Sequence, residues 1–436
     1  AYGNVKTVTD ALNRTTTNIY DATGTYLTQI ANVLGHTRSL AYDPRLGQVT
    51  SSTDQNGQTT TTQYDAVGRV TKVIGPTDTA ALPTIRYEYD PCLTTGGCTQ
   101  PIRATVHTRV QSGQPQELSV YTFADGLGRT LQTRSPAEDP TKQIVSGAVE
   151  LNNRGLVVKQ WVPYLEAFSA SYVAVTAPAP RPLPLAPPVT YTYDPLGRLL
   201  TTIDPNGSTT ATAYDDGTVT LTDANGNRTR RTSDAAGRLV KVEELNGTET
   251  YTTTYQYDTL NNLTQVTDAK GNVTRISYDS LGRKLSMDDP DMDRWTYAYD
   301  AVDNLITQTD ARGVAISFTY DALNRLVRKD YTIPQTSDIR PQTSVTYTYD
   351  NPAKTFSKGK LTEIADGSGS SSFEYDQLGQ LVTESKTVDG TTRTIQRAYD
   401  LLGRLTTLTY PDTEQALYTY NPHGGLETVT VQSPVS

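Results

Sequence analysis

Tyrosine, aspartate and arginine recur side by side in this chain. The stretch TRISYDSLGRKL, residues 274–285, places a carboxylate and a guanidinium close to a phenol. Related stretches are YDAVGRV at 64–70, YDPLGRLL at 193–200, YDALNRLV at 320–327 and YDLLGRLT at 399–406. Carboxylate pairs catalyse glycoside hydrolysis, and Asp and Arg side chains bind charged sugars. The motif is therefore either a copied active or binding site, or a copied structural element.

The D-x-x-G part of the motif favours a structural role, because it is turn chemistry. Asp is favoured at the first position of a type I turn, and Gly at the fourth, where φ is often positive. Where the Gly is missing, Asn replaces it, at Asn13, Asn261 and Asn324. Asn is the other residue that tolerates the left-handed region. A catalytic motif has no reason to exchange Gly for Asn, so the pattern predicts hairpin turns. In the most regular stretch the predicted turn residues are Asp258, Asp268, Asp279, Gly282, Asp300, Asp310, Gly313, Asp321 and Asn324.

The segments between these turns read as strands. Tyr-Asp pairs recur every 21 residues, at 258, 279, 300 and 321, and a second turn falls between them. Each segment of six or seven residues alternates between an aromatic face and a face of Thr, Ser, Arg and Gln, which is typical of a strand. The expected aromatic ladder contains Tyr278, Trp295, Tyr297, Tyr299, Phe318 and Tyr320.

The choice of aromatic residue predicts the kind of sheet. The chain has 28 Tyr and 5 Phe, whereas a dry sandwich core favours Phe and aliphatic residues. Tyr suits a half-wet face, because its hydroxyl needs a partner. We expect an all-β fold, in which antiparallel hairpins form one spiral, shell- or barrel-like sheet. Its tyrosines stack from strand to strand, with the Gly-Arg arginines over neighbouring rings.

Interruptions divide the repeat array without ending it. We expect repeats over 1–134, an irregular insertion over 135–188 and repeats again over 189–436, in one continuous array that is a fragment of a longer protein. Within the insertion, residues 161–173 are expected to form a short helix or a surface flap. The Pro-rich segment 177–188 is either an extended strap or a disordered linker. A smaller insertion at 351–360 is expected to leave the sheet as a longer loop.

Few other residues point to chemistry. The histidines His36, His107 and His423 share no metal-ligand spacing, and no nucleophile-elbow, zinc-protease or phosphate-loop motif is present. A Ca²⁺ site in the acidic stretch 288–293 stays an alternative to a solvated loop, although the spacing is not that of a known calcium loop. We expect no cofactor, no metal and no catalytic residue here. Only a His, Tyr and Arg cluster that breaks the repeat, near His107 or His423, would argue for an enzyme.

Composition limits the partners and the compartment. The 38 Lys and Arg residues are spread evenly through a chain of net charge −9, which argues against nucleic-acid binding. No apolar run is long enough for a membrane span. Cys92 and Cys98 flank a Thr-Thr-Gly-Gly turn and are expected to form a disulfide, which implies a secreted or cell-surface protein; two free thiols are the alternative.

Together the repeats resemble the YD repeats of the Rhs family, as in YDSLGRKL, YDPLGRLL and TDANGN at 222–227. The segment from residue 120 through the Pro-rich strap is similar to Rhs proteins associated with toxin-complex or SpvB-like regions. The resemblance implies a hollow β-shell that encloses a C-terminal toxin in bacteria, or serves adhesion in animal teneurins. Bacterial shells typically end in an aspartyl self-cleavage site with paired D-P-x-G elements. Asp194-Pro195-Leu196-Gly197 has these letters within an ordinary repeat, and Asn421 stands where the acid is needed. Self-cleavage is therefore expected to lie outside these residues or to be lacking.

Two classes of function follow. The first is a shell segment that encapsulates a cargo polypeptide, such as the protein's own C-terminal toxin domain, without turnover. The second is an extracellular glycan-binding or adhesive surface, because exposed tyrosines stack on sugar rings, or a fibre formed when open sheet ends self-assemble. A glycan-active enzyme is a narrower form of the second class.

Overall fold

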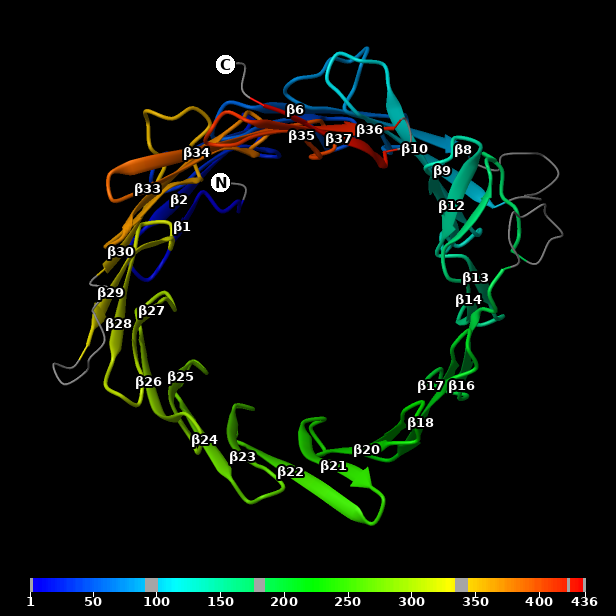
Figure 1. The fold of residues 1–436 in the computed structure, drawn as a ribbon, viewed down its shortest axis with the longest axis vertical. Helices are drawn as coiled ribbons and strands as arrows, with labels where there is room; N and C mark the ends of the chain where they lie inside the picture. The colour runs from blue at the N-terminus through cyan, green and yellow to red at the C-terminus, as the bar shows by residue number, and fades with distance from the viewer. Residues whose placement is uncertain (1–2, 91–100, 176–184, 334–343, 422–423, 434–436) are drawn as a thin grey trace.

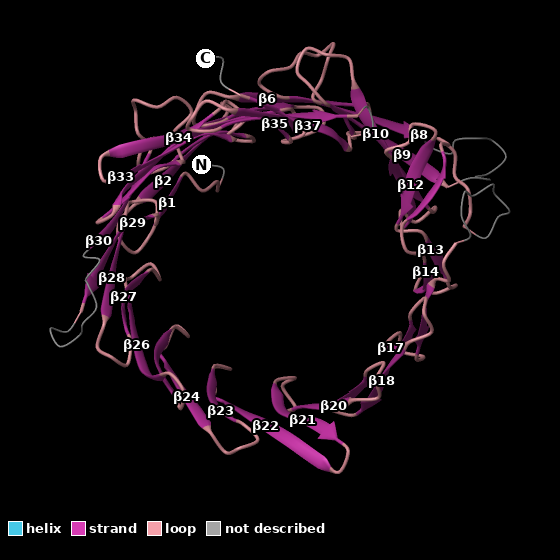
Figure 2. Ribbon diagram, in the orientation of Figure 1, coloured by secondary structure: helices cyan, strands magenta, loops and turns pink. Residues whose placement is uncertain are grey.

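The computed structural model describes residues 3–90, 101–175, 185–333, 344–421 and 424–433. These residues form strands and turns and contain no helix (Figure 2). The strands belong to two antiparallel sheets of 13 and 24 strands. The all-β hairpin array expected from the sequence is thus confirmed, with the strands divided between two sheets.

The first sheet follows the chain order almost throughout. Its strands are β1 (Thr7–Thr9), β2 (Thr15–Tyr20), β3 (Leu27–Ala31), β4 (Thr37–Asp43), β5 (Gln48–Thr53), β6 (Thr59–Tyr64), β7 (Val70–Ile74), β8 (Ile85–Asp90), β9 (Ile102–Arg109), β10 (Glu117–Ala124), β11 (Thr130–Pro136), β12 (Lys142–Ser146) and β15 (Tyr164–Ala167). β15 pairs back onto β12 and forms the last strand of this sheet.

The second sheet begins at β13, beside the end of the first. Its strands are β13 (Val149–Leu151), β14 (Val157–Gln160), β16 (Val189–Tyr193), β17 (Leu199–Ile203), β18 (Thr209–Asp215), β19 (Thr218–Thr222), β20 (Arg228–Ser233), β21 (Leu239–Asn246), β22 (Glu249–Tyr257), β23 (Leu263–Thr267), β24 (Val273–Tyr278), β25 (Lys284–Asp289), β26 (Asp293–Tyr299), β27 (Leu305–Thr309), β28 (Ala315–Tyr320), β29 (Leu326–Thr332), β30 (Ser344–Tyr349), β31 (Leu361–Asp366), β32 (Gly369–Tyr375), β33 (Leu381–Val388), β34 (Thr391–Tyr399), β35 (Leu405–Thr409), β36 (Gln415–Tyr420) and β37 (Leu426–Gln432).

The strip of hairpins winds into a spiral around an open centre (Figure 1). It completes more than one turn, so that late repeats come alongside the first ones. Hydrogen bonds between residues 302 to 310 positions apart join the two turns. Outside the region of β12 to β16, each strand pairs with its chain neighbours, and this explains how such large sheets leave few free edges.

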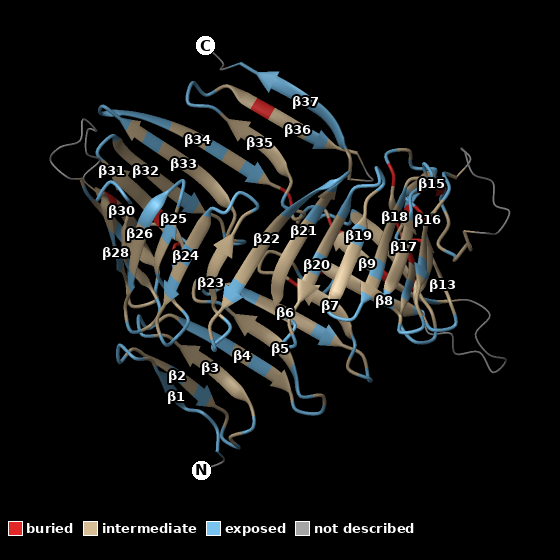
Figure 3. Ribbon diagram, turned by 90° about the horizontal axis from the view of Figure 1, so that it is seen from below, coloured by how far each residue is buried: buried red, intermediate tan, exposed pale blue. Residues whose placement is uncertain are grey.

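The wall is one layer thick, so it has little buried core. Figure 3 shows that most of the strands are of intermediate burial or exposed. One small apolar cluster of Val145, Ala148 and Trp161 lies where the two sheets meet. Stability therefore rests on contacts between adjacent repeats, as in other repeat proteins.

Residues 161–173 form a flap, one of the two structures expected for them, and contain no helix. β15 extends the first sheet, and the residues after it fold over β10. Phe168 packs edge-on against Tyr121 with ring centroids 6.1 Å apart, and Tyr172 lies 5.7 Å from Phe123. The Pro-rich segment lies mainly outside the described residues, and so the choice between strap and linker stays a prediction.

Candidate functional site: the repeated turn and the spiral seam

The Y-D-x-x-G-R motif forms a hairpin turn whose polar groups bond to one another. In the copy at 279–283, the Asp279 N–H donates to the Arg283 carbonyl at 3.0 Å, and the Gly282 N–H donates to the Asp279 carbonyl at 3.1 Å. Gly282 has φ +79°, and the pairing register shifts between Ser277 and Tyr278. This is a type I turn closed by a bulge with a left-handed residue.

The Asp side chain holds the turn from inside. Oδ1 of Asp279 accepts the N–H groups of Leu281 and Arg283 at 2.9 and 3.0 Å, and Oδ2 accepts Arg283 Nε at 2.6 Å. The structure places Asp258, Asp268, Asp300, Asp310 and Asp321 in the same role. The left-handed position is held by Gly313 at φ +77° and Asn324 at φ +61°, and also by Asp303 at φ +69°.

The motif tyrosine and arginine link each turn to the next. Tyr320 donates its hydroxyl to the Leu305 carbonyl at 2.9 Å, so the buried phenol is satisfied. The Arg283 guanidinium carbon lies 5.2 Å from the Tyr299 ring centroid, over the ring of the next Tyr-Asp pair. The same contact joins Arg69 to Tyr89, Arg198 to Tyr214, Arg238 to Tyr257, Arg325 to Tyr349 and Arg404 to Tyr420.

The predicted aromatic ladder lies on one half-buried face: Tyr278, Trp295, Tyr297, Tyr299, Phe318 and Tyr320. Its construction differs from the expected stacking of rings. In the described residues, rings stack directly at Tyr26–Tyr42 and Tyr87–Tyr89. At other rings a cation lies over the face instead, as Lys284 does 4.4 Å from Tyr297, because the turn places an Arg or Lys near a ring on the neighbouring strand.

Electrostatics in the turns oppose acid catalysis. The Arg283 N–H is the largest of several hydrogen bonds that hold the pKa of Asp279 below its ordinary value, against the effect of desolvation. At Asp43, hydrogen bonds from the Arg45 side chain and backbone lower the pKa to about 2. These carboxylates are ionised at neutral pH, and their oxygens already accept hydrogen bonds. Asp279 and Asp43 are therefore unsuited to donate a proton to a substrate.

His107 lies in a polar cluster that interrupts the repeat. Its Nδ1 is 2.8 Å from Ser119 Oγ, and its Nε2 is 3.5 Å from a carboxylate oxygen of Glu88. This order of groups is like that of a Ser-His-acid triad. However, Ser119 lies within the extended strand β10, opposite His107 on β9, rather than at a turn that presents a nucleophile beside oxyanion-hole donors. The cluster instead joins three strands.

The other candidates are the acidic stretch 288–293, the two cysteines and His423. Asp289, in the acidic stretch, bonds to Thr274 and to the backbone of its own turn. Across the part of the chain that the structure describes, no three His, Cys, Asp or Glu side chains gather as metal ligands. Cys92, Cys98 and His423 lie outside the described residues, so the disulfide stays a prediction. No helix in the described residues is long and apolar enough to cross a membrane.

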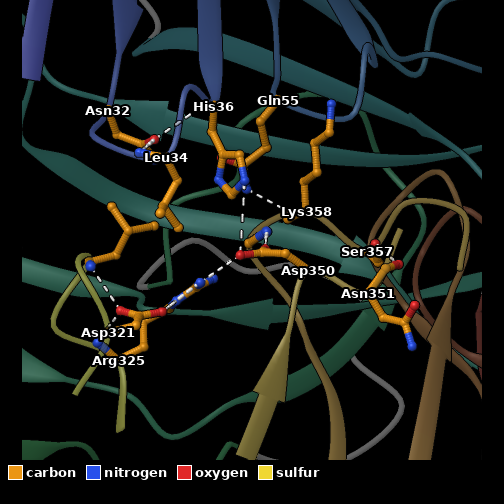
Figure 4. Close-up of polar contacts among 12 residues, drawn as sticks. Asn32, Leu34, His36, Gln55, Asp321, Arg325, Asp350, Asn351, Ser357 and Lys358 are labelled. Atoms are coloured by element: carbon orange, nitrogen blue, oxygen red, sulfur yellow. Dashed lines mark hydrogen bonds and ion pairs between the residues drawn. The ribbon is translucent and has the colours of Figure 1, made fainter. Parts of the chain in front are cut away.

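The contacts that sequence reasoning missed lie at the seam between spiral turns. Hairpin turns alternate between two edges of the strip. We call the edge with the Tyr-Asp turns the YD rim and the edge with the turns at Asp10, Asn32 and Asp54 the far rim. The far rim of the first spiral turn meets the YD rim of the second (Figure 4). Its only signals in the sequence are His36, in place of a turn Arg or Asn, and the insertion at 351–360.

Side chains bridge the seam at several points. Arg14 donates to the Asp321 carbonyl at 3.2 Å and to Asn324 Oδ1 at 2.8 Å. A direct backbone bond of 2.9 Å joins the Leu401 N–H to the Val110 carbonyl. In Figure 4, His36 points across the seam toward Asp350, whose carboxylate lies 3.9 Å from His36 Nε2.

Asp350 is the centre of an ion-pair row. Arg325 bridges Asp350 Oδ2 at 2.5 Å and Asp321 Oδ2 at 2.7 Å. Burial opposes ionisation of Asp350, but hydrogen bonds from Arg325 and the Gly359 N–H outweigh it, so that the pKa lies below its ordinary value of 3.8. The row is charged at neutral pH and supports the seam.

Acid should weaken this row. A carboxylate whose pKa is lower in the folded state contributes stability that is fully present above its unfolded pKa and is lost as pH falls through the folded one. We therefore expect the unfolding midpoint to fall as the pH drops below about 4, in part through Asp350. In an Asp350→Asn variant, the urea midpoint should fall less than in the native protein as the pH is lowered below about 4. An identical fall of the midpoint in both proteins would show that the Asp350 carboxylate does not contribute this stability.

The seam covers apolar side chains that the rest of the YD rim exposes. The third residue of each turn is often Leu or Val. Leu127, Leu196 and Leu281 are 81%, 76% and 70% exposed. At the seam, Leu323 and Leu402 are half-buried. The seam thus buries the same groups that project freely elsewhere.

Comparison with known families explains the repeat. The RHS Repeat model matches residues 42–80, 188–210, 193–228, 234–273, 257–291, 293–332 and 357–392. The chain belongs to the RHS-repeat family. The matched ranges lie mostly within regular hairpins of this Rhs chain and leave out the flap region as well as the first and last hairpins. A search of curated protein sequences found no match.

Solved structures share the shell fold of this Rhs chain. A crystal structure of TcdB2-TccC3-Cdc42 superposes with TM-score 0.83 over 98% of the chain at 17% identity, and one of TcdB2-TccC3 with TM-score 0.83 over 98% at 19%. The Photorhabdus luminescens Tc holotoxin pore, with the TccC3-D651A mutation, gives TM-score 0.83 over 98% at 18% identity. The Rhs chain spans 25% to 28% of those chains. At this identity, the likeness establishes the fold.

Proposed function

We propose that this Rhs chain is a wall segment of a secreted shell that encloses a polypeptide, such as a toxin domain of the same protein. The observation that carries the proposal is the one-layer spiral sheet around an open centre (Figure 1). A globular enzyme folds around a packed core, whereas this chain leaves both faces of its sheet wet. The similarity to structures that contain TccC3 supports the same function.

The face of the sheet opposite the aromatic side chains suits a container that does not recognise its cargo specifically. Hydroxyl groups on neighbouring strands bond to each other there, as in Thr192–Thr201 at 2.6 Å, Ser277–Ser286 at 2.6 Å and Thr419–Thr428 at 2.7 Å. Because these hydroxyls are paired and uncharged, they offer no fixed site to a ligand. Enclosure rather than recognition would then retain the cargo.

The aromatic face gives less support to glycan binding. A sugar stacks on an open aromatic face, but the guanidinium or ammonium groups of Arg198, Arg283 and Lys284 already cover tyrosine rings. The exposed Leu side chains of the YD rim are instead suited to pack against a further spiral turn of repeats, as Leu323 and Leu402 do at the seam. The free rims would then continue the shell beyond the wall segment seen here.

Electron microscopy of the full-length protein, combined with limited proteolysis, tests the proposal. We expect closed particles with internal density, and a polypeptide that resists protease until the particle is denatured. A matched sample of the same protein in denaturant should lose this protection. Open strips or fibres whose segments are all cleaved at similar rates would overturn the shell function and favour adhesion, and glycan binding would then be measured on the same particles.

A further inference from the structure

One hairpin of the second spiral turn departs from the motif at the seam. Asp350 is followed by Gly359 and Lys360, which occupy the positions of Gly282 and Arg283. Eight residues, 351–358, therefore stand where two, 280–281, stand in a regular turn. The Asp350 N–H still donates to the Lys360 carbonyl at 3.1 Å, so this closing bond of the hairpin is kept beneath the insertion, while the Gly359 N–H donates to the Asp350 side chain.

The insertion is ordered by its own contacts. Ser357 is 3% exposed and donates to the Asn351 carbonyl at 2.8 Å. Lys354 folds back onto the sheet and donates from Nζ to Ser372 Oγ at 2.5 Å and to the Phe373 carbonyl at 3.0 Å. These bonds hold the insertion in one conformation and direct its tip toward the first spiral turn.

Lys358, the last residue of the insertion, contacts the first spiral turn through its main chain. The Asn56 side-chain amide accepts the Lys358 N–H at 3.0 Å and donates to the Lys358 carbonyl at 3.1 Å. Gln55 Nε2 donates to the same carbonyl at 2.8 Å. The two spiral turns share no strand pairing here, so these side-chain hydrogen bonds take the place of backbone bonds between strands (Figure 4).

Gly359 permits this close approach. Its φ is +81°, and a Cβ at this position would lie 1.9 Å from Gln55 Nε2. Any larger residue would displace the Gln55 side chain from its bond to the Lys358 carbonyl and would strain the turn. The glycine therefore fits both its own hairpin and the neighbouring strip.

We propose that residues 351–360 are a latch that locks adjacent spiral turns together and closes the seam of the wall. The inference rests on the proposed shell function, because a closed seam matters only where the wall must retain a cargo. The latch acts where the wall is weak: within each sheet the strands are joined by backbone hydrogen bonds, but the seam is held by separate contacts.

Hydrogen exchange of the Lys358 amide, measured by mass spectrometry on peptides that cover 351–360, tests the latch. In Asn56→Ala we expect exchange about tenfold faster or more, because the acceptor of that amide and a second bond are lost. Asn56→Asp keeps the acceptor, so the exchange rate of the Lys358 amide in this variant should lie between those of the native protein and Asn56→Ala. Asn225→Ala is the matched control, because Asn225 occupies the same position in the turn 223–227 and is exposed.

A second variant separates the latch from folding. Replacing 351–358 with Ser-Leu restores a regular turn, so the strands should keep their exchange protection while far-rim peptides around Gln55 and Asn56 exchange faster. Unchanged exchange at Lys358 in Asn56→Ala, or unchanged far-rim exchange after loop replacement, would overturn the latch. The measurement needs no cargo, so the latch can fail while the shell function holds, and the reverse.

Discussion

Gly282→Val is expected to destabilise its hairpin by about 2–3 kcal/mol, since a β-branched residue is strained at positive φ. Gly282 has φ +79°, and a Cβ there would also lie 3.2 Å from Asn262 Oδ1. Neither the bulge nor the closing bonds can form without this conformation. The loss should appear as a lower urea midpoint and as faster hydrogen exchange in β24 and β25.

Gly282→Asn is the matched control. Asn13, Asn261 and Asn324 occupy the same turn position with φ of +60°, +69° and +61°, so the chain itself shows that Asn is accepted there. Gly282→Asn should lower the stability of the hairpin less than Gly282→Val does, by below about 1 kcal/mol. Equal losses for Val and Asn would mean that the left-handed conformation is not what stabilises the turn. Because repeat arrays open locally, exchange in the adjacent strands is the sharper measurement.

Arg325→Ala is expected to cause the largest loss among the motif arginines, about 2–3 kcal/mol. The side chain is 18% exposed, pairs with Asp321 and Asp350, and lies 4.4 Å from the Tyr349 ring centroid. Its removal leaves two half-buried carboxylates facing each other, and uncompensated charges of this kind are costly. Partial solvent access reduces the loss from that of a fully buried pair.

Arg198→Ala is the comparison, because Arg198 has the same motif position away from the seam. It is 46% exposed and pairs with Asp194 alone, so its loss should be smaller. In an Asp350→Asn background, Arg325→Ala should cost less than in the native chain, because one of the two charges is gone. Thermal and urea denaturation measure both differences. If Arg325→Ala lowers the free energy of unfolding no more than Arg198→Ala does, the ion-pair row does not stabilise the seam. The same follows if its effect is equal in the native and Asp350→Asn backgrounds.

The repeated turn was predictable from sequence because its determinants are local. The Asp, the left-handed residue and the arginine fall within five residues, and the tyrosine that the arginine covers lies on the adjacent strand. The left-handed residues Gly282, Gly313 and Asn324 therefore lie where the spacing places them. The ladder was predicted less well: composition indicated tyrosine faces, but only the paired strands show which rings are covered by a cation, as Tyr297 and Tyr299 are.

The hairpin, its period and the half-wet face could be read from the sequence, since each depends on residues that are neighbours along the chain or across one turn. The curvature and pitch of the spiral became visible only in the folded chain. Small twists add over many strands, and their sum brings Arg14 to Asn324 and Asn56 to Lys358, more than 300 residues apart. No local pattern encodes such a sum, so the seam, the Asp350 ion-pair row and the insertion that binds Asn56 emerged only from the folded chain.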